Sequence, residues 1–293
     1  IRKVLEMKIG TREFDFNSGH SVVMGILNVT PDSFSDGGKF NNIEAMLKQA
    51  EQMALAGVDI FDVGGESTRP GGAAVSAEEE QNRVLPAVIE LKKHFDVPIS
   101  VDTYRASTAR KVVEAGADLI NDVWGLCHPD DKKHEMAEVI SEFKCPIVIM
   151  HNRESILPDE LIEKTGIHVS AYIDEIIEDL KKSLKVARNA GVDEDKIIID
   201  PGIGFAKSVS GNIHAMNHAE VFTEFGYPVL LGISRKSIIG KTLDFPTNER
   251  EEATVALNVM GRMKGHHIFR VHDVRANRRA LDMADAVLLD GRK

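Results

Sequence analysis

The feature that most constrains the fold is an alternation of short apolar runs with longer amphipathic stretches, which begins at Val22 and continues to the end of the chain. Eight such pairs follow one another, and the short runs are rich in β-branched residues, which favour strands. The predicted strands are residues 22–29, 60–64, 99–102, 119–122, 147–151, 197–200, 229–233 and 268–271. The predicted helices begin near Asn42, Ala77, Ser107, His134, Ala171, Ala215, Glu249 and Val274.

Strict alternation of strand and helix predicts a parallel sheet, because parallel neighbours need a crossover connection between them. Eight repeats in 293 residues fit a closed α/β barrel, the (β/α)8 TIM barrel, or a long doubly wound sheet, and the count favours the barrel. No shift in composition marks a linker, so residues 1–293 are expected to form a single domain. Residues 3–16 alternate apolar and polar around Gly10, which predicts a short β-hairpin within an N-terminal extension of residues 1–18.

The overall charge restricts the class of partner. The chain has 36 Lys and Arg against 46 Asp and Glu, and a net charge of -10 argues against nucleic acid or an anionic membrane. No apolar run approaches the roughly 20 residues of a membrane span. The two cysteines, Cys127 and Cys145, lack the number and spacing of a disulfide framework or a metal-binding pair, and no sequence pattern activates Cys127. These features predict a soluble, cytoplasmic protein that acts on small molecules.

Polar residues stand where several predicted strands end, which is where barrel enzymes place their chemistry. Asp102, Asn121 and Asp200 end the third, fourth and sixth strands, and Lys236 follows the seventh. If these side chains point inward, two carboxylates and one carboxamide converge near a lysine. Such a cluster can accept the paired N–H donors of a flat heterocycle with an aminopyrimidine edge. The alternative is an internal Asp–Lys ion pair that only holds the end of the barrel together.

Cationic residues gather at the ends of the last two predicted strands. Because side chains alternate between the two faces of a strand, Arg270 and His272 are expected to project the same way. The same alternation places Gly232, Ser234 and Lys236 on one face. The pattern predicts a two-donor anion clamp and a phosphate site, which suits a small anionic substrate on an acidic protein.

Two further features lie beside these clusters. Asn28 lies at the end of the first predicted strand and could give an oxygen ligand to Mg²⁺. This ion often needs only one or two protein ligands, because water and phosphate complete its shell. Phe34, Pro70 and Phe205 lie in loop or strand-end segments and could form a slot for a second, ring-containing substrate. Ordinary loop packing is the alternative for each of these residues.

Seven strings, taken together and in order, closely resemble dihydropteroate synthase. They are NVTPDSF from Asn28, ESTRPG from Glu66, SVDT from Ser100, NDV from Asn121, DPG from Asp200, SRKS from Ser234 and RVHDV from Arg270. They cover nearly the whole predicted barrel and are highly specific as a set. The resemblance implies a transferase that condenses 6-hydroxymethyl-7,8-dihydropterin pyrophosphate with p-aminobenzoate, giving 7,8-dihydropteroate and pyrophosphate in folate biosynthesis. It also implies a target of sulfonamides, which mimic p-aminobenzoate.

Position by position, the resemblance implies three groups of substrate contacts. The pterin contacts are Asp102, Asn121, Met150, Asp200 and Lys236. The pyrophosphate contacts are Asn28, which also holds Mg²⁺, Thr68, Arg270 and His272. The p-aminobenzoate slot is formed by Phe34, Arg69, Pro70, Phe205, Lys236 and Ser237. The catalytic set is Asp102, Asp200, Lys236, Arg270 and His272.

The resemblance also implies an SN1-like order of events. Mg²⁺, Arg270 and His272 would stabilise the charge of the departing pyrophosphate by preorganised electrostatics. Its departure would leave a cationic pterin methylene beside Asp102 and Asp200. The aromatic amine, unprotonated at neutral pH, would then attack without a strong general base.

The family resemblance carries expectations about assembly and loop motion as well. Members of the family are generally homodimers, so a homodimer is expected here. The loops of residues 32–39 and 66–76 are rich in Gly, Pro and Ser and are expected to act as mobile lids over the bound pyrophosphate.

Two alternatives stay open. The pterin-binding barrel of corrinoid-dependent methyltransferases is similar in fold, but it needs no pyrophosphate clamp. The strings at residues 68–70, 234–236 and 270–272 therefore favour the synthase. The second alternative is a homologue that binds pterin without turnover. The intact residues Asn28, Asp102, Lys236 and His272 argue against it.

Overall fold

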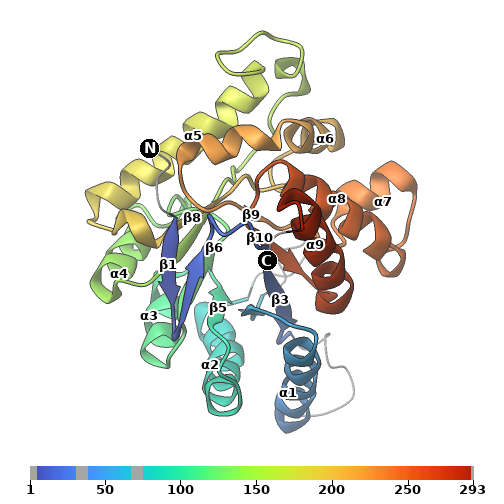
Figure 1. Cartoon of the computed structure of the whole chain (residues 1–293). Helices are drawn as coiled ribbons and strands as arrows, with labels where there is room; N and C mark the ends of the chain where they lie inside the picture. Colours follow the sequence, from blue (N-terminus) through green and yellow to red (C-terminus); the bar gives the residue numbers. More distant parts are fainter. Residues whose placement is uncertain (1–4, 31–38, 67–74, 292–293) are drawn as a thin grey trace.

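The computed structural model describes residues 5–30, 39–66 and 75–291, with side chains from residue 43 onward in the second range. Within these ranges eight parallel strands form a barrel surrounded by helices, which confirms the predicted fold class (Figure 1). The strands are β3 (Val22–Asn28), β4 (Ile60–Gly64), β5 (Ile99–Asp102), β6 (Leu119–Asp122), β7 (Ile147–Met150), β8 (Ile197–Asp200), β9 (Leu230–Leu231) and β10 (Ile268–Val271).

The strands follow one another around the barrel in chain order, and β10 returns to pair with β3. Between β8 and β9 the barrel closes through a single parallel bridge, which joins Ile199 of β8 to Val229, the residue immediately before β9. The carboxyl ends of all eight strands therefore meet at one rim. Side chains from strands far apart in the sequence can converge there.

Helices pack around the outside of the barrel (Figure 1). They are α1 (Lys39–Leu55), α2 (Ala77–His94), α3 (Ala106–Glu114), α4 (Glu135–Phe143), α5 (Ala171–Asn189), α6 (Val209–Asn217), α7 (Ser237–Leu243), α8 (Glu251–Met263) and α9 (Val274–Leu288). Gly57, Gly116 and Gly191 follow α1, α3 and α5 with φ angles of 85°, 107° and 80°. These left-handed positions end the helices, as the sequence predicted.

Three elements differ from the sequence prediction. The prediction of a helix start near Ala215 is wrong, because α6 begins at Val209, where the Ser208 hydroxyl accepts a hydrogen bond from the Gly211 amide at 2.9 Å and caps the helix. Helix α7 was not predicted, since its 7 residues give too little periodicity to detect. The seventh strand is shorter than the predicted residues 229–233, and its ladder to β10 has two residue pairs.

Apolar side chains form two core layers. The larger layer lies between the strands and the outer helices, and residues such as Val63, Val101 and Ile149 face it. The smaller layer fills the barrel interior, where Met24, Ile60 and neighbouring strand residues pack together. Burial on both faces explains why the strands appear in the sequence as nearly continuous apolar runs.

The N-terminal hairpin closes the barrel at the end opposite the rim. It consists of β1 (Glu6–Ile9) and β2 (Arg12–Asp15), and both strands are antiparallel. Its apolar side chains, among them Ile9 and Phe14, pack onto the interior layer of the barrel. In Figure 1 the hairpin lies in front of the barrel strands.

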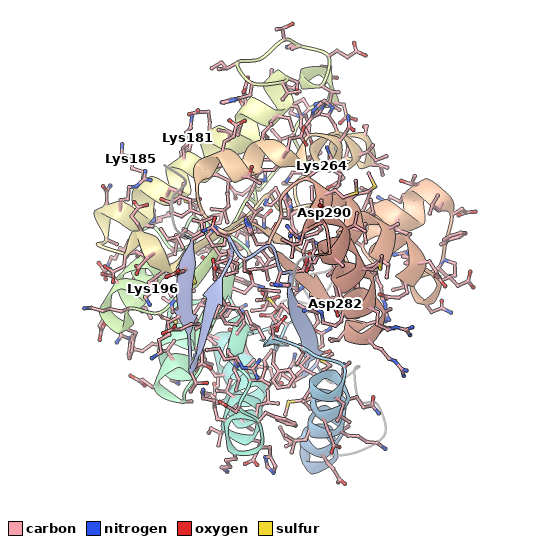
Figure 2. The ribbon with its side chains drawn as sticks, viewed as in Figure 1. Lys181, Lys185, Lys196, Lys264, Asp282 and Asp290 are labelled. Carbon is pink, nitrogen blue, oxygen red and sulfur yellow. The ribbon has the colours of Figure 1, made fainter. Side chains whose placement is uncertain are left out.

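Charged side chains occupy the outside of the helical ring. Figure 2 shows Lys181 and Lys185 at the outer edge of the molecule along α5, and both are exposed, as is Asp282 on α9. In the part of the chain that the structure describes, we find no helix with the length and apolar character needed to cross a membrane.

Candidate active site

Backbone register aligns the predicted residues at the carboxyl-terminal rim. Asn28 pairs with Gly64, Gly64 with Asp102, and Asp102 with Asn121 across four successive strands. On the far side of the rim, Met150 of β7 is paired with Asp200 of β8. The register alone places the predicted pterin and magnesium residues of five strands, β3 and β5 to β8, at the same end of the barrel.

A buried carboxylate that the sequence analysis did not select lies at the centre of this cluster. Asp62 of β4 has no exposed surface, and its carboxylate accepts hydrogen bonds from Ser100 Oγ at 2.6 Å and Arg270 Nε at 2.6 Å. Asn121 Nδ2 donates a longer bond of 3.4 Å to the same carboxylate. The available signal was a charged residue inside an apolar strand, because such a residue is rarely fully buried without a partner.

Arg270 joins two carboxylates inside the barrel. Its Nε contacts Asp62, and its Nη2 donates to Asp102 Oδ2 at 2.9 Å. The Arg270 side chain is 19% exposed, so it lies at the boundary between the barrel interior and the rim. On its other side, a Cβ added at Gly232 would stand 3.6 Å from Asp200 Oδ2 and 3.9 Å from Arg270 Cδ. The arginine is thus held in a fixed position close to both predicted catalytic carboxylates.

Lys236 reaches the cluster by a route that strand alternation did not predict. Strand β9 ends at Leu231, and a turn follows in which the Lys236 amide donates to the Ile233 carbonyl at 3.2 Å and Arg235 has φ of 55°. The shared face predicted for Gly232, Ser234 and Lys236 is therefore wrong as a strand feature. The Lys236 ammonium nevertheless donates to the Ile203 carbonyl and lies 4.5 Å from the centre of the Phe205 ring.

His272 lies just beyond the end of β10, and its contacts differ from those of Arg270. Its Nδ1 is 2.9 Å from Ser234 Oγ, and its backbone amide donates to the same hydroxyl at 3.1 Å. It faces a groove of about 800 Å³ between α1 and the start of α9 that Arg235 and Arg275 also line. Arg270 and His272 therefore have different partners at the rim, Asp62 and Asp102 for the arginine and Ser234 for the histidine.

Burial shifts the ionisation of the central residues. It raises the pKa of Asp102 to about 7, against the opposing effect of the Arg270 charge. Burial likewise raises the pKa of Asp200, which the Lys236 charge partly offsets. Burial lowers the pKa of Lys236 to about 8, although the Asp200 carboxylate favours its charged form. Acids and bases with pKa values moved toward neutrality are characteristic of functional sites.

The remaining predicted residues divide between described and undescribed parts of the chain. Met150 is buried at the end of β7, Phe205 is half-buried in the turn after β8, and Ser237 is exposed at the start of α7. The predicted residues that lie outside the described residues are Phe34, Thr68, Arg69 and Pro70, together with most of both predicted lid loops.

Asn28, the predicted magnesium ligand, is the last residue of β3 and pairs with Gly64 of β4. A Cβ added at Gly64 would stand 3.2 Å from Asn28 Oδ1 and 3.9 Å from the Asp102 Cβ, so the glycine leaves space between these two side chains. In residues 5–30, 43–66 and 75–291, no group of three His, Cys, Asp or Glu side chains could hold a metal ion. A magnesium ion at Asn28 would therefore take most of its ligands from water and phosphate, which is the usual arrangement for this ion.

Comparison with known proteins agrees with the geometry. Residues 24–272 match the family model described as pterin binding enzyme. A dihydropteroate synthase of Clostridium beijerinckii is 48% identical over 283 residues, which cover 96% of this chain and 99% of the relative.

Solved structures give the same result. The crystal structure of a Clostridium difficile dihydropteroate synthase in the presence of pteroic acid is 41% identical, with a TM-score of 0.84, and the match covers 96% of this chain and 98% of that one. A Xanthomonas albilineans dihydropteroate synthase with 4-aminobenzoic acid is 35% identical, with a TM-score of 0.87, over 98% of this chain and 99% of that one.

Proposed function

Because the chain belongs to the dihydropteroate synthase family of pterin-binding enzymes, we propose that it condenses 6-hydroxymethyl-7,8-dihydropterin pyrophosphate with p-aminobenzoate by an SN1-like route. The products are 7,8-dihydropteroate and pyrophosphate. One observation supports the proposal at the level of single residues. Four side chains converge at one rim of the barrel, namely Asp102, Asp200, Lys236 and Arg270.

The acid and amide side chains bind the pterin ring in this proposal. Asp102, Asn121 and Asp200 supply hydrogen-bond acceptors and one amide donor for the edge of a flat aminopyrimidine. Met150, buried beside Asp200 in the backbone register, would contact the apolar side of the ring. Negative charge on Asp102 and Asp200 favours the cationic methylene that forms when the carbon–oxygen bond to pyrophosphate breaks.

The cationic side of the rim binds the diphosphate. Arg270 is already oriented by Asp62 and Asp102, so little reorganisation is needed when an anion arrives. His272 and Thr68 complete the clamp in the proposal. When bound at Asn28, Mg²⁺ would neutralise charge on the diphosphate.

The second substrate occupies the slot formed by Phe205, Lys236 and Ser237 together with Phe34, Arg69 and Pro70. Its amine attacks the methylene, a carbon–nitrogen bond forms, and the amine proton passes to solvent. Sulfonamides would bind in the same slot as mimics of p-aminobenzoate.

The proposal also includes a cytoplasmic homodimer. Cys127 and Cys145 are both free thiols, which supports a reducing compartment. Exposed apolar side chains on the neighbouring helices α8 and α9 support self-association, with Met263 at 68% and Val287 at 66% exposure.

The direct test of the proposed function is turnover. The protein is incubated with the pterin pyrophosphate, p-aminobenzoate and Mg²⁺, and dihydropteroate and pyrophosphate are quantified. Formation of both products in equal amounts supports the proposal. Pyrophosphate release without dihydropteroate, or formation of neither product, contradicts it.

The pH dependence follows from the two shifted groups. We expect kcat/KM for the pterin substrate to fall below pH of about 7, where Asp102 becomes protonated and loses an acceptor. We expect it to fall again above pH of about 8, where Lys236 loses its charge. A pH–rate profile checks both limbs. Asp102→Asn should remove the acid limb, and an unchanged acid limb in this variant would contradict the assignment.

The magnesium site predicts a specific effect at Asn28. Asn28→Ala should raise the Mg²⁺ concentration needed for half-maximal turnover by about tenfold or more, because one protein oxygen is lost. Asn28→Asp should lower that concentration, since a carboxylate attracts the ion more strongly. Magnesium titrations of the two variants and the parent measure the effect, and identical curves for all three would exclude Asn28 as a ligand.

A further inference from the structure

The turn between β8 and α6 has its backbone carbonyls bound by lysine ammonium groups on two sides. On one side Lys236 donates to the carbonyl of Ile203. On the other side Lys207 Nζ donates to the carbonyls of Gly202 at 2.9 Å and Phe205 at 3.1 Å. The turn carries the Phe205 ring, against which the Lys236 ammonium lies.

The backbone of this turn needs such support. Gly202, Gly204 and Ala206 have φ angles of 66°, 92° and 48°. Glycine adopts the left-handed region freely, but alanine does so at a cost, so surrounding contacts must hold it there. A Cβ at Gly202 would stand 2.0 Å from the His151 carbonyl oxygen, which shows how closely the turn packs on the end of β7.

Lys207 is an unusual residue for a buried position. Lys207 is only 7% exposed. Burial lowers the pKa of its ammonium to about 7, and the charge of Asp200 partly offsets this lowering. A buried ammonium is costly unless its three donors are all satisfied. The third donor meets Nδ1 of His151 at 2.8 Å. The ammonium is therefore fully coordinated by two carbonyls of the turn and one imidazole.

His151 is suited to act as an acceptor. It is 2% exposed, and burial together with the Lys207 charge lowers its pKa to about 4, so the imidazole is neutral. Its Nε2 lies 3.3 Å from Asp179 Oδ2, and Asp179 is itself bound by Arg153 at 3.1 Å and Lys182 at 2.8 Å. Because an ammonium can only donate, Nδ1 of the neutral ring accepts from Lys207, and the ring proton is on Nε2, on the side of Asp179.

We propose that Lys207, held by His151, is a positioning residue that fixes the turn carrying Phe205 and so sets the affinity for the aromatic amine substrate. It reaches the substrate slot only through the backbone of the turn. This inference rests on the proposed function, because that function assigns Phe205 and Lys236 to the p-aminobenzoate slot.

The principal test separates the two Michaelis constants. Lys207→Met keeps an unbranched side chain, one atom shorter than lysine, and removes the ammonium, so the carbonyls of Gly202 and Phe205 lose their donor. We expect KM for p-aminobenzoate to rise by about tenfold or more, the effect of losing a charged hydrogen-bond donor, while KM for the pterin pyrophosphate changes by less than about threefold. Lys182→Met is the matched control, because it removes an exposed lysine from Asp179 without touching the turn, and it should leave both constants unchanged.

A second pair of variants, at His151, tests the same positioning role of Lys207 and does not depend on how well Lys207→Met folds. In His151→Asn the amide oxygen can replace Nδ1 as acceptor, and KM for p-aminobenzoate should stay near the parent value. In His151→Leu the acceptor is lost, and that KM should rise. Equal KM values in the two His151 variants, or a Lys207→Met variant with the parent's KM for p-aminobenzoate, would overturn the inference. An inactive parent enzyme would instead refute the proposed function, on which the inference depends.

Discussion

Asp200→Ala is expected to lower kcat by about 100-fold or more while the protein stays folded, because Asp200 supplies both an acceptor for the pterin ring and negative charge beside the methylene. Asp200 is 4% exposed, and burial raises its pKa, so its charged form costs folding energy in the free protein. Its removal also takes the acceptor from the Gly202 amide, which donates to Asp200 Oδ1 at 2.7 Å, so the two effects oppose each other and the thermal unfolding temperature should stay close to that of the parent. Steady-state kinetics and thermal unfolding of the variant measure both effects.

The control for this prediction is a carboxylate at the other end of the barrel. Asp118 immediately precedes β6, where it accepts a hydrogen bond from the Ile99 amide at 2.9 Å. Asp118→Asn should change kcat by less than twofold. Lys236→Ala, by contrast, should lower kcat as strongly as Asp200→Ala, since the two side chains act on the same ring. Parent-like turnover in either Asp200→Ala or Lys236→Ala would exclude the assigned role.

Arg270→Ala is expected to weaken binding of the pterin pyrophosphate by about 100-fold, which corresponds to the loss of one partner of a buried charged contact. KM for p-aminobenzoate should change by less than about threefold, because the guanidinium lies on the diphosphate side of the site. The variant should also unfold at a lower temperature, since Asp62 and Asp102 lose their shared cation. Isothermal calorimetry with the pterin pyrophosphate gives the affinity.

Arg270→Lys separates charge from geometry. Lysine keeps the positive charge but cannot hold Asp62 and Asp102 through separate nitrogens of one planar fork. Its affinity for the pterin pyrophosphate should lie between those of the parent and Arg270→Ala. If Arg270→Ala bound the pterin pyrophosphate as tightly as the parent does, the assignment of Arg270 to the pyrophosphate clamp would be wrong.

The sequence was sufficient to predict the barrel because its strands are buried on both faces. The run Ile197–Asp200 is apolar until the carboxylate at its rim end, and Ile147–Met150 is apolar throughout and is followed directly by His151. The polar residue that ends each run marks both the strand and the position at the rim. Helix α6 was placed too late, because the Ser208 cap and not the apolar periodicity marks its start.

The candidate site was predicted less completely, for physical reasons that differ between residues. Alternation is a property of a strand, so it could not be extended to Lys236, which lies in a turn beyond β9. Asp62 was overlooked because it lies in the middle of its strand and not at the end, and because its partners come from β5, β6 and β10. Lys207 was overlooked because two of its three partners are backbone carbonyls, which no side-chain pattern reveals.

The central claim is that one rim binds two chemically different parts of a substrate, the ring through acids and the diphosphate through cations. Calorimetry with two separate probes, 6-hydroxymethylpterin and inorganic pyrophosphate with Mg²⁺, tests it most directly. We predict that Asp200→Ala loses affinity mainly for the pterin and Arg270→Ala mainly for pyrophosphate. Equal losses of both probes in both variants, or retention of both probes in either variant, would contradict the account.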